Sequence, residues 1–333
     1  MSQLILTAIG GDIAEIVRLG EGPDPTVGPD DVLVAIDATP VNHANFLRAA
    51  GWFGVPAPIP SVLGSEGVGH VVAAGSATDQ TLVGRRVIIL PTFEQGTWSD
   101  RVVVPARNVV AVGEQGDMLQ MAMLAINPAT AYVLLNRFVA VKPGDWIGQT
   151  LGSSAVGQYV TALAHRAGVK TLSIVRREES VGKIRALGGD LVLVDGPDLS
   201  NRVAQALGDS RLRLVLDGVG GSKAGDLVGV LESGGTVVAY SSQTGEPPAL
   251  PVGDLIYRDI SLRSFFIANW IREAPRAEIE QTYAELARLV AEGVLHAAVE
   301  TTYPLSQYRV ALTRAQDPRR TGKVLFSLGS AGR

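Results

Sequence analysis

Residues 147–160 read IGQTLGSSAVGQYV, and this stretch carries the signal that decides the fold. A short β-type run leads into Gly152-Ser153-Ser154-Ala155-Val156-Gly157, and a helical run follows. The spacing is that of G-x-G-x-x-G, with Ser154 in the place of the middle glycine. Such a turn points backbone N–H groups and the positive end of a helix at a pyrophosphate. Taken alone, the degenerate motif fits a plain strand–helix turn equally well, so its surroundings must decide.

The segments after residue 145 alternate between β-type and helical runs. We expect strands at 145–151, 171–177, 191–195, 213–219, 235–241 and 260–267. Helical runs at 154–168 and 179–189 separate the first three strands, and each ends in glycine, as helix C-termini often do. This alternation predicts a parallel, doubly wound sheet. In that setting the glycine turn predicts dinucleotide binding.

The second strand of this sheet ends in two cations, Arg176 and Arg177, about twenty residues beyond the glycine turn. Sites for NAD place Asp or Glu there, on the adenosine ribose. A 2′-phosphate carries about −1.5 to −2 charges, and a charge-assisted contact with it contributes roughly 1.5–3 kcal/mol. Glu178 and Glu179 follow and are expected to begin the next helix and point away. The arginine pair therefore indicates NADPH, and a solvated surface pair is the alternative.

Composition excludes several classes of protein. The chain has 333 residues, of which 46% are hydrophobic and 19% charged, so two domains are expected. A net charge of −4, with no Lys/Arg block longer than two residues, argues against nucleic-acid and membrane-surface partners. The absence of cysteine excludes disulfides and thiolate zinc sites. Without a signal-like N-terminus or an apolar run of membrane-spanning length, a soluble cytoplasmic protein is expected.

The remaining segments differ from the alternating region in composition and in the spacing of their apolar residues. Residues 1–110 are rich in Gly and Pro with short β-type runs, which predicts a compact β domain, such as a partly open barrel. Residues 117–138 have helical spacing, as do residues 275–295, and a β segment at 322–328 follows. The chain is therefore predicted to combine a β domain with an α/β domain.

Seven landmarks, in this order and spacing, carry a resemblance to a known family. They are GSEGVGHVVAAGS (64–76), GTWSDRVVVP (96–105), NPATAY (127–132), GSSAVGQ (152–158), LDGVGG (216–221), LIYRDISLRSFFIANW (255–270) and GKVLF (322–326). The chain resembles the zinc-free branch of the medium-chain dehydrogenase/reductase superfamily, which contains quinone oxidoreductases and 2-enoyl thioester reductases. The ending SFFIANW is similar to the enoyl reductases. The resemblance implies a GroES-like β-barrel domain at 1–122 and 266–333, a Rossmann NADP-binding domain at 123–265, and a homodimer.

The zinc-binding members of that superfamily use ligands that this chain lacks. Their GHE segment corresponds here to Gly64-Ser65-Glu66, and their first cysteine falls near Asn42. His43 and His70 are two lone histidines, for which a structural role is the better interpretation. We therefore expect no metal.

The resemblance also implies a chemistry and a departure from it. Hydride passes from NADPH to Cβ of an activated C=C bond, a proton reaches Cα, and donors stabilise the negative charge on the carbonyl oxygen. The family's tyrosine in a G-x-Y segment corresponds to Phe53 in Gly51-Trp52-Phe53-Gly54. Three interpretations stay open. Another donor acts (the Trp52 indole N–H, the cofactor ribose hydroxyl or water), or the substrate is a quinone that needs little acid, or the protein binds NADPH with little turnover.

Further site residues follow from the resemblance and from their place at strand ends. Asn42, Trp52, Phe53 and Thr130 are the candidates for the catalytic cleft. The candidate cofactor residues beyond the glycine turn and the arginine pair are Gln149, Tyr240, Ser241, Phe265, Phe266, Ile267 and Lys323. Cations that could recognise a coenzyme A or carrier-protein thioester are Arg48, Arg258, Arg263 and Arg272.

Three functions are weighed on this basis. The first is an NADPH-dependent reductase of activated C=C bonds, acting on 2-enoyl thioesters or related α,β-unsaturated carbonyls as small-molecule substrates. The second is an NADPH:quinone oxidoreductase, and the third is a non-catalytic NADPH-sensing protein. A zinc alcohol dehydrogenase is rejected because its ligands are missing.

Overall fold

A computed structural model describes residues 1–23 and 25–328, and the chain divides into two compact units. Unit 1 is formed by Met1–Ile126 and Ile271–Arg333, and unit 2 by Asn127–Trp270. The sequence analysis placed the divisions after residues 122 and 265. Residues 329–333, at the end of the expected domain segment 266–333, lie outside the described residues.

Unit 2 is built on a six-stranded sheet in the order β11-β10-β9-β12-β13-β14. Its strands are β9 (Trp146–Gln149), β10 (Lys170–Val175), β11 (Leu191–Val194), β12 (Leu212–Asp217), β13 (Leu231–Ala239) and β14 (Ser261–Ser264). Every neighbouring pair in this order is parallel. The predicted doubly wound sheet is confirmed. Its strand order reverses at β9, and ligands of such sheets bind at the carboxyl ends of the strands beside that reversal.

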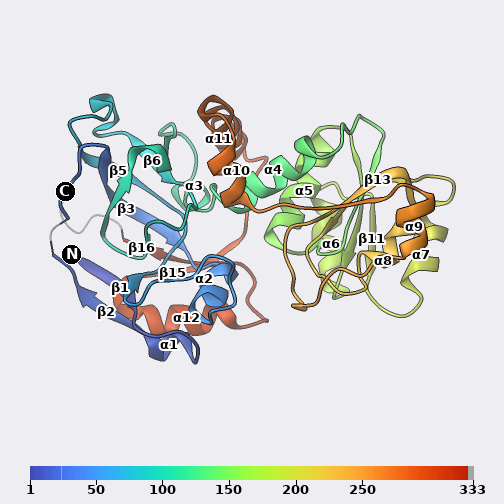
Figure 1. Ribbon diagram of the computed structural model, residues 1–333, viewed down its shortest axis with the longest axis horizontal. Helices are drawn as coiled ribbons and strands as arrows, with labels where there is room; N and C mark the ends of the chain where they lie inside the picture. The colour runs from blue at the N-terminus through green and yellow to red at the C-terminus, as the bar shows by residue number, and fades with distance from the viewer. Residues whose placement is uncertain (24, 329–333) are drawn as a thin grey trace. The chain divides into compact units, whose positions relative to one another are not determined.

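Helices lie on both faces of this sheet. The helices of unit 2 are α4 (Asn127–Arg137), α5 (Ala155–Arg166), α6 (Glu179–Ala186), α7 (Leu199–Leu207), α8 (Gly225–Val228), α9 (Val252–Tyr257) and α10 (Ile267–Glu273), of which α4 packs on α5 and α10 continues into unit 1. Figure 1 shows α5 and α6 on one side of the sheet and α7 and α8 on the other. Because both faces are covered, Leu172, Val215 and Val237 of the strands are fully buried.

The predicted strand at 260–267 ends earlier than expected. Strand β14 stops at Ser264, and Ile267 already begins α10. All four residues of this edge strand are exposed, whereas Phe265 is buried and packs edge-to-face on Phe138 with ring centroids 6.1 Å apart. Tertiary packing of the aromatic ring ends the strand, and the β-rich composition of the segment could not show that.

Unit 1 contains two sheets. The smaller has the order β2-β1-β4, and the seven-stranded one follows the path β15-β16-β3-β5-β6-β8, with β7 pairing with β3. The strands are β1 (Ser2–Leu6), β2 (Val17–Glu21), β3 (Asp31–Pro40), β4 (Ser61–Val62), β5 (Gly67–Ala74), β6 (Arg86–Ile89), β7 (Arg101–Pro105), β8 (Val109–Ala111), β15 (Val299–Tyr303) and β16 (Lys323–Ser327). Alternate residues of the strands, among them Val34, Val71 and Val87, fill a core between them. The predicted β domain is therefore present.

Three helices of unit 1, α1 (Ile13–Ile16), α2 (His43–Ala49) and α12 (Tyr308–Gln316), were not predicted by the sequence analysis. The others are α3 (Met118–Ala122) and α11 (Arg276–Ala291), and short 3₁₀ turns lie at Gln80–Leu82, Ala106–Asn108 and Leu305–Gln307. Helix α12 buries Tyr308, Ala311 and Leu312, which have the i, i+3, i+4 spacing of an apolar helix face. That spacing was present in the sequence and could have revealed the helix.

The helical run at 117–138 is divided between α3 and α4, so the two units meet in sequence within it. None of the helices among residues 1–23 and 25–328 combines the length and the apolar character that crossing a membrane requires.

Candidate functional site

The glycine turn of unit 2 joins β9 to α5 at the carboxyl edge of the sheet. Ser154 caps α5, because its Oγ accepts a hydrogen bond of 3.0 Å from the backbone N–H of Gly157. A Cβ on Gly157 would lie 2.4 Å from the backbone oxygen of Leu151, and one on Gly152 would lie 2.8 Å from Cβ of Ser173. Only glycine fits at both positions. The turn thus brings bare backbone to the positive end of a helix of 12 residues, which is the geometry of an anion cradle.

Gln149 lies beneath this turn. Its side chain is 1% exposed, and Nε2 lies 3.1 Å from the backbone oxygen of Gly157, 3.0 Å from Oγ1 of Thr161 and 2.8 Å from Oγ of Ser173. These contacts tie β9 to α5 and β10. They explain why a polar residue stands in a buried strand, and they give Gln149 a supporting position under the turn. The other turn residues predicted from sequence are Ser153, which is half-buried, and Ala155 and Val156, which form the first turn of α5.

Arg176 and Arg177 follow β10 directly and are both exposed. Nη1 of Arg177 lies 3.6 Å from Oε1 of Glu179, so the expectation that Glu179 points away is wrong. Arg176 has no ion-pair partner among the described residues. An exposed pair at this distance contributes little to stability, and both guanidinium groups remain accessible to an anion.

Tyr240 follows β13 at the same edge of the sheet. Its hydroxyl is buried beside the hydroxyl of Ser154, which is close enough to influence its pKa but does not complete a well-formed hydrogen bond within the described part of the chain. Burial raises the pKa of this phenol above its usual value, and the charge of Asp217 raises it further, while the hydroxyl of Ser154 opposes them. A buried donor without a partner marks a place where a bound group could complete the hydrogen bond. Ser241, the next residue, is exposed.

Asp217 is a residue of this edge that the sequence analysis quoted in a motif but did not assign. It ends β12 fully buried, and its Oδ1 accepts hydrogen bonds from Oγ1 of Thr150 (2.6 Å) and from the backbone N–H of Val219 (3.1 Å). The contacts fix the turn after β12 beside the turn after β9. An aspartate ending the apolar run LVLD was the signal for it.

The remaining candidates of unit 2 are apolar or buried. Phe265 is buried against Phe138, as described above, and Ile267 is the buried first residue of α10. Phe266, between them, is half-buried. Thr130 lies buried in α4. The structure therefore brings the glycine turn and Tyr240 together, whereas the arginine pair lies at the end of the neighbouring strand.

In unit 1, three polar side chains form a chain of hydrogen bonds through the interior. Asn42, at the start of α2, donates from Nδ2 to Oε1 of Glu66 (2.7 Å) and accepts at Oδ1 from Nζ of Lys323 (2.9 Å). The second carboxylate oxygen of Glu66 accepts from the backbone N–H of Ile126 (2.8 Å). Asn42 and Lys323 were predicted site residues, and Glu66 was missed. Its signal was a carboxylate within the apolar segment GSEGVGHVV.

Burial shifts the pKa of both charged members. Burial raises the pKa of Glu66 to about 7, although the hydrogen bond from Asn42 and the charge of Lys323 lower it. Burial lowers the pKa of Lys323 to about 8, with Glu66 opposing and Arg320 adding to the decrease. Tyr283 of α11 donates its hydroxyl to the backbone oxygen of Ala125 (2.8 Å), and burial raises its pKa. The pKa of Glu66 and the pKa of Lys323 thus both lie within about one unit of neutral pH.

This shift predicts a pH dependence of stability. The pKa of Glu66 rises from about 4.5 to about 7 on folding, so its contribution is complete below about pH 4.5 and is lost as the pH rises to about 7. Lys323 stays protonated between pH 4.5 and 7, so its contribution to the free energy of unfolding does not change over that range. Between pH 4.5 and pH 7, we expect the free energy of unfolding of wild type to fall by about 1–3 kcal/mol relative to that of Glu66→Gln. Urea unfolding at several pH values measures this difference. Glu15→Gln, an exposed carboxyl of the same unit, is the control and should keep the wild-type trend. Equal trends for Glu66→Gln and wild type would contradict the prediction.

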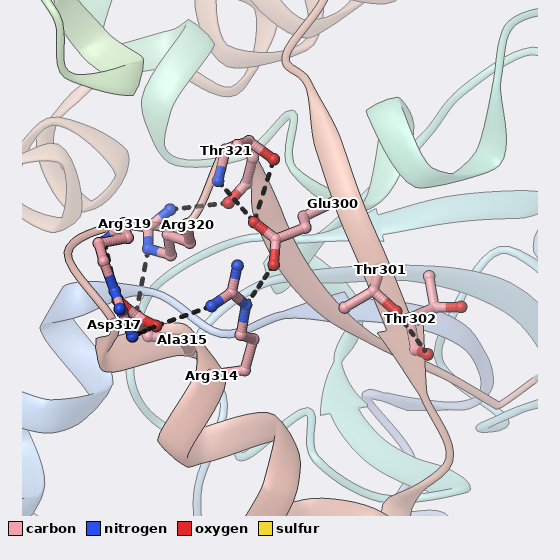
Figure 2. Close-up of polar contacts among 10 residues, drawn as sticks. Glu300, Thr301, Thr302, Arg314, Ala315, Asp317, Arg319, Arg320 and Thr321 are labelled. Carbon is pink, nitrogen blue, oxygen red and sulfur yellow. Dashed lines mark hydrogen bonds and ion pairs between the residues drawn. The ribbon is translucent and has the colours of Figure 1, made fainter.

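The turn before Lys323 is held by a second polar network. Figure 2 shows Glu300 of β15 meeting Arg314 of α12 and the backbone of Thr321. Nη1 of Arg314 also donates to Asp317 (2.7 Å), and the guanidinium of Arg320 donates to the backbone oxygen of Gly322 (2.9 Å). Because Arg314 stabilises its charge, the pKa of Glu300 is lowered to about 2. These contacts fix the turn from which β16 begins at Lys323.

The loop after α2 carries the two aromatic candidates. Trp52 is 82% exposed. Phe53 is half-buried, with its ring centroid 5.0 Å from that of Phe93 at an angle of 59°. Of the cations considered for thioester recognition, Arg48 is only 4% exposed and Arg258 is paired with Asp254 at 2.8 Å. Neither offers a free guanidinium to the surface.

The segments that the resemblance aligns with the zinc ligands of the superfamily make other contacts in this structure. Oγ of Ser65 accepts from Nδ2 of Asn45 (2.7 Å), and Glu66 is engaged as above. His70 pairs with Asp37 at 2.7 Å, and His43 is exposed. Nowhere in residues 1–23 and 25–328 do three or more potential ligand side chains gather so that they could hold a metal ion.

Two family models match this chain. The model described as alcohol dehydrogenase GroES-like domain matches residues 28–114, and the one described as zinc-binding dehydrogenase matches residues 187–325. The first match lies in the β domain of unit 1, so this domain has the predicted GroES-like fold. The second begins in the nucleotide-binding fold and ends in β16.

Similar proteins cover nearly the whole chain. The mitochondrial enoyl-[acyl-carrier-protein] reductase of Rattus norvegicus is 31% identical over 323 residues, which is 96% of this chain and 86% of that protein. A mycobacterial quinone oxidoreductase has a TM-score of 0.89 at 24% identity, covering 98% of this chain and 99% of its own. Etr1p, a mitochondrial 2-enoyl thioester reductase of Candida tropicalis solved with NADP and crotonyl-CoA, has a TM-score of 0.80 at 22% identity, with the same coverage.

Proposed function

Because this chain belongs to the enoyl and quinone reductase branch of the medium-chain dehydrogenase/reductase superfamily, we propose that it is an NADPH-dependent oxidoreductase that reduces activated C=C bonds. The substrates are 2-enoyl thioesters or related α,β-unsaturated carbonyls. The observation that carries this proposal is the glycine turn at the carboxyl edge of the sheet of unit 2, with two accessible arginines at the end of the next strand. The name of the rat relative supports the substrate class.

The residues of unit 2 fit the cofactor. The bare backbone at Gly152 and Gly157 and the start of α5 would hold the pyrophosphate. The unpartnered hydroxyl of Tyr240 would bond a nearby polar group of the cofactor, and Arg176 and Arg177 would bind the 2′-phosphate. We assign Ser241 and Phe266 secondary contacts with the cofactor, and Thr130 a place in the catalytic cleft. When bound, NADPH supplies the hydride.

The residues of unit 1 are assigned complementary roles. Lys323 is the proposed cofactor contact, and Asn42 is the residue that holds it, because the amide of Asn42 joins Lys323 to Glu66. The proposed hydride transfer uses no metal, since Asn42 and Ser65 stand where zinc-binding relatives have ligands. Positive charge at Lys323 would favour the negative charge that builds up on the substrate carbonyl.

A second candidate function is an NADPH:quinone oxidoreductase. The observation that favours it is the phenyl ring of Phe53, which cannot donate a proton, because the oxygens of a reduced quinone take protons readily from water. The likeness to the mycobacterial quinone oxidoreductase agrees with it. A non-catalytic NADPH sensor is the third candidate, and absence of turnover with both acceptor types despite NADPH binding would favour it.

The test is NADPH oxidation by the purified chain with crotonyl-CoA as acceptor. We expect NADPH consumption with formation of the saturated thioester, and slower consumption of NADH under the same conditions. A quinone acceptor in parallel separates the two enzymatic candidates. Binding of NADPH without conversion of crotonyl-CoA would overturn the thioester assignment.

Two accompanying expectations stay predictions. A homodimer is implied by the resemblance, and sedimentation equilibrium of the purified chain would test it. The expected cytoplasmic location contrasts with the names of the curated relatives, which place those enzymes in mitochondria, and cell fractionation would decide.

A further inference from the structure

Unit 1 contains a cavity of about 340 Å³ that no residue of the proposed reductase site lines. Its walls come from β1, β4 and β7, from the end of α2 and from the segment that follows β6. The residues that matter here are Arg48, Ser61, Val62, Phe93, Arg101 and Val103. A volume of this order is at the small end of the range for ligand sites.

The guanidinium of Arg48 is the unusual group in this wall. The residue is 4% exposed, and no carboxylate of the described residues lies within ion-pair distance. Nη2 makes two long hydrogen bonds, 3.2 Å to the backbone oxygen of Phe93 and 3.4 Å to that of Pro56. Nε is buried without a partner among the described residues, and Nη1 donates to none of them. A buried cation without a counter-ion is costly, so the arrangement calls for an anion.

Ser61 supplies a second, independent observation. Its Oγ is buried and has no hydrogen-bond partner in the described part of the chain. Ser61 lies on β4 and Arg48 on α2, and both residues line the same cavity. Buried polar groups in native proteins are nearly always paired, and rotation of the Ser61 hydroxyl toward the cavity would give it an acceptor on a bound molecule.

The charge of the cavity favours an anion. Glu94 also lines it, but its Oε2 is engaged by Arg107 at 2.7 Å and by Asn108 at 3.1 Å. Arg101, which is exposed, adds a second positive charge to the wall and has no ion-pair partner among the described residues. The cavity is therefore positive around Arg48 and Arg101.

The rest of the wall is apolar. Phe93 is held with φ at 64°, a conformation uncommon for a bulky residue, and its ring lies 5.5 Å from the guanidinium carbon of Arg48. Val62 and Val103 add aliphatic surface. A phosphate alone would leave this apolar surface uncovered, whereas a carboxylate with a hydrocarbon body would cover it.

We propose that this cavity binds a small organic carboxylate with an apolar body, whose carboxylate accepts hydrogen bonds from Arg48 and Ser61 and whose hydrocarbon part lies against Phe93, Val62 and Val103. A chain of about six carbons suits a cavity at the small end of the ligand-site range. Such a ligand satisfies both orphan donors and neutralises the buried charge. No residue of the proposed reductase site lines this cavity, although its wall residue Phe93 packs on Phe53, and the binding test does not depend on turnover.

The experiment is calorimetric titration of the full-length protein with hexanoate, with hexan-1-ol and hexanamide as uncharged probes of similar size. We expect saturable binding of one hexanoate per chain and no comparable binding of the other two. Arg48→Met keeps the length and apolar stem of the side chain and should weaken hexanoate binding about 10- to 100-fold. Ser61→Ala should weaken it about 3- to 10-fold.

Control variants test whether the loss of hexanoate binding is specific to the cavity. Arg85→Met removes an exposed charge of the same unit that does not line the cavity, and its affinity for hexanoate should equal that of wild type. Should Arg48→Met fail to fold, Ser61→Ala and Arg48→Lys carry the test, because lysine keeps the charge but loses the planar fork. The proposal is overturned by non-saturable binding, by equal binding of hexan-1-ol, or by unchanged affinity in folded variants of Arg48 and Ser61.

Discussion

Replacing Arg176 and Arg177 together by alanine is expected to lower the preference for NADPH over NADH by about 10- to 100-fold or more. Both guanidinium groups are exposed at the end of β10, and Arg176 has no ion-pair partner among the described residues. Arg176 is therefore available to bind the 2′-phosphate that distinguishes the two cofactors, and Arg177, which pairs with Glu179, lies next to it in the chain. Each charge-assisted contact contributes about 1.5–3 kcal/mol.

The measurement is the ratio of kcat/KM for NADPH to that for NADH with a fixed acceptor. The values for NADH should change little, because NADH has no phosphate at that position. Arg185→Ala removes an exposed arginine from α6 of the same unit and should leave the ratio unchanged. A double variant that keeps the wild-type ratio would show that the arginine pair is only a solvated surface feature.

Replacing Phe53 by tyrosine is expected to raise kcat with crotonyl-CoA by about 100-fold, since general acid catalysis commonly contributes 10²–10⁴ in rate. The resemblance places Phe53 at the tyrosine of the family's G-x-Y segment, and its ring is half-buried against Phe93. The substitution adds one hydroxyl to a ring that is already placed. KM should change little, because the added group acts on the charge that develops in the transition state.

Steady-state rates with crotonyl-CoA and with a quinone check this expectation, and the quinone rate should stay the same. Trp52→Phe tests the alternative donor, because it removes an exposed indole N–H while keeping an aromatic ring. If the thioester rate is unchanged in Phe53→Tyr and falls in Trp52→Phe, the indole is the donor. If neither variant changes it, water or the cofactor ribose supplies the proton.

Most of the fold followed from local sequence. The alternation of β-type and helical runs after residue 145 gave the parallel sheet, because strand and helix periodicities are local properties. The end of β14 and helices α1, α2 and α12 were not obtained. Strand β14 ends where Phe265 packs on Phe138, a contact between residues far apart in the chain. Helix α12 had its apolar spacing in the sequence, and no long-range information was needed to find it.

Some residues of the candidate site also followed from local sequence, whereas others were found only in the tertiary structure. The sequence by itself determined the glycine turn and the place of Arg176 and Arg177, since both depend on spacing within one strand–helix–strand unit. Only the tertiary structure joined Asn42, Glu66 and Lys323. Asn42 stands at the start of α2, Glu66 directly before β5, and Lys323 at the start of β16. It also buried Arg48 beside a cavity that Ser61 lines, without an acidic partner for the guanidinium among the described residues. Burial and hydrogen-bond pairing are properties of neighbours in space, and the free energy of a buried charge depends on those neighbours rather than on the residues beside it in the chain.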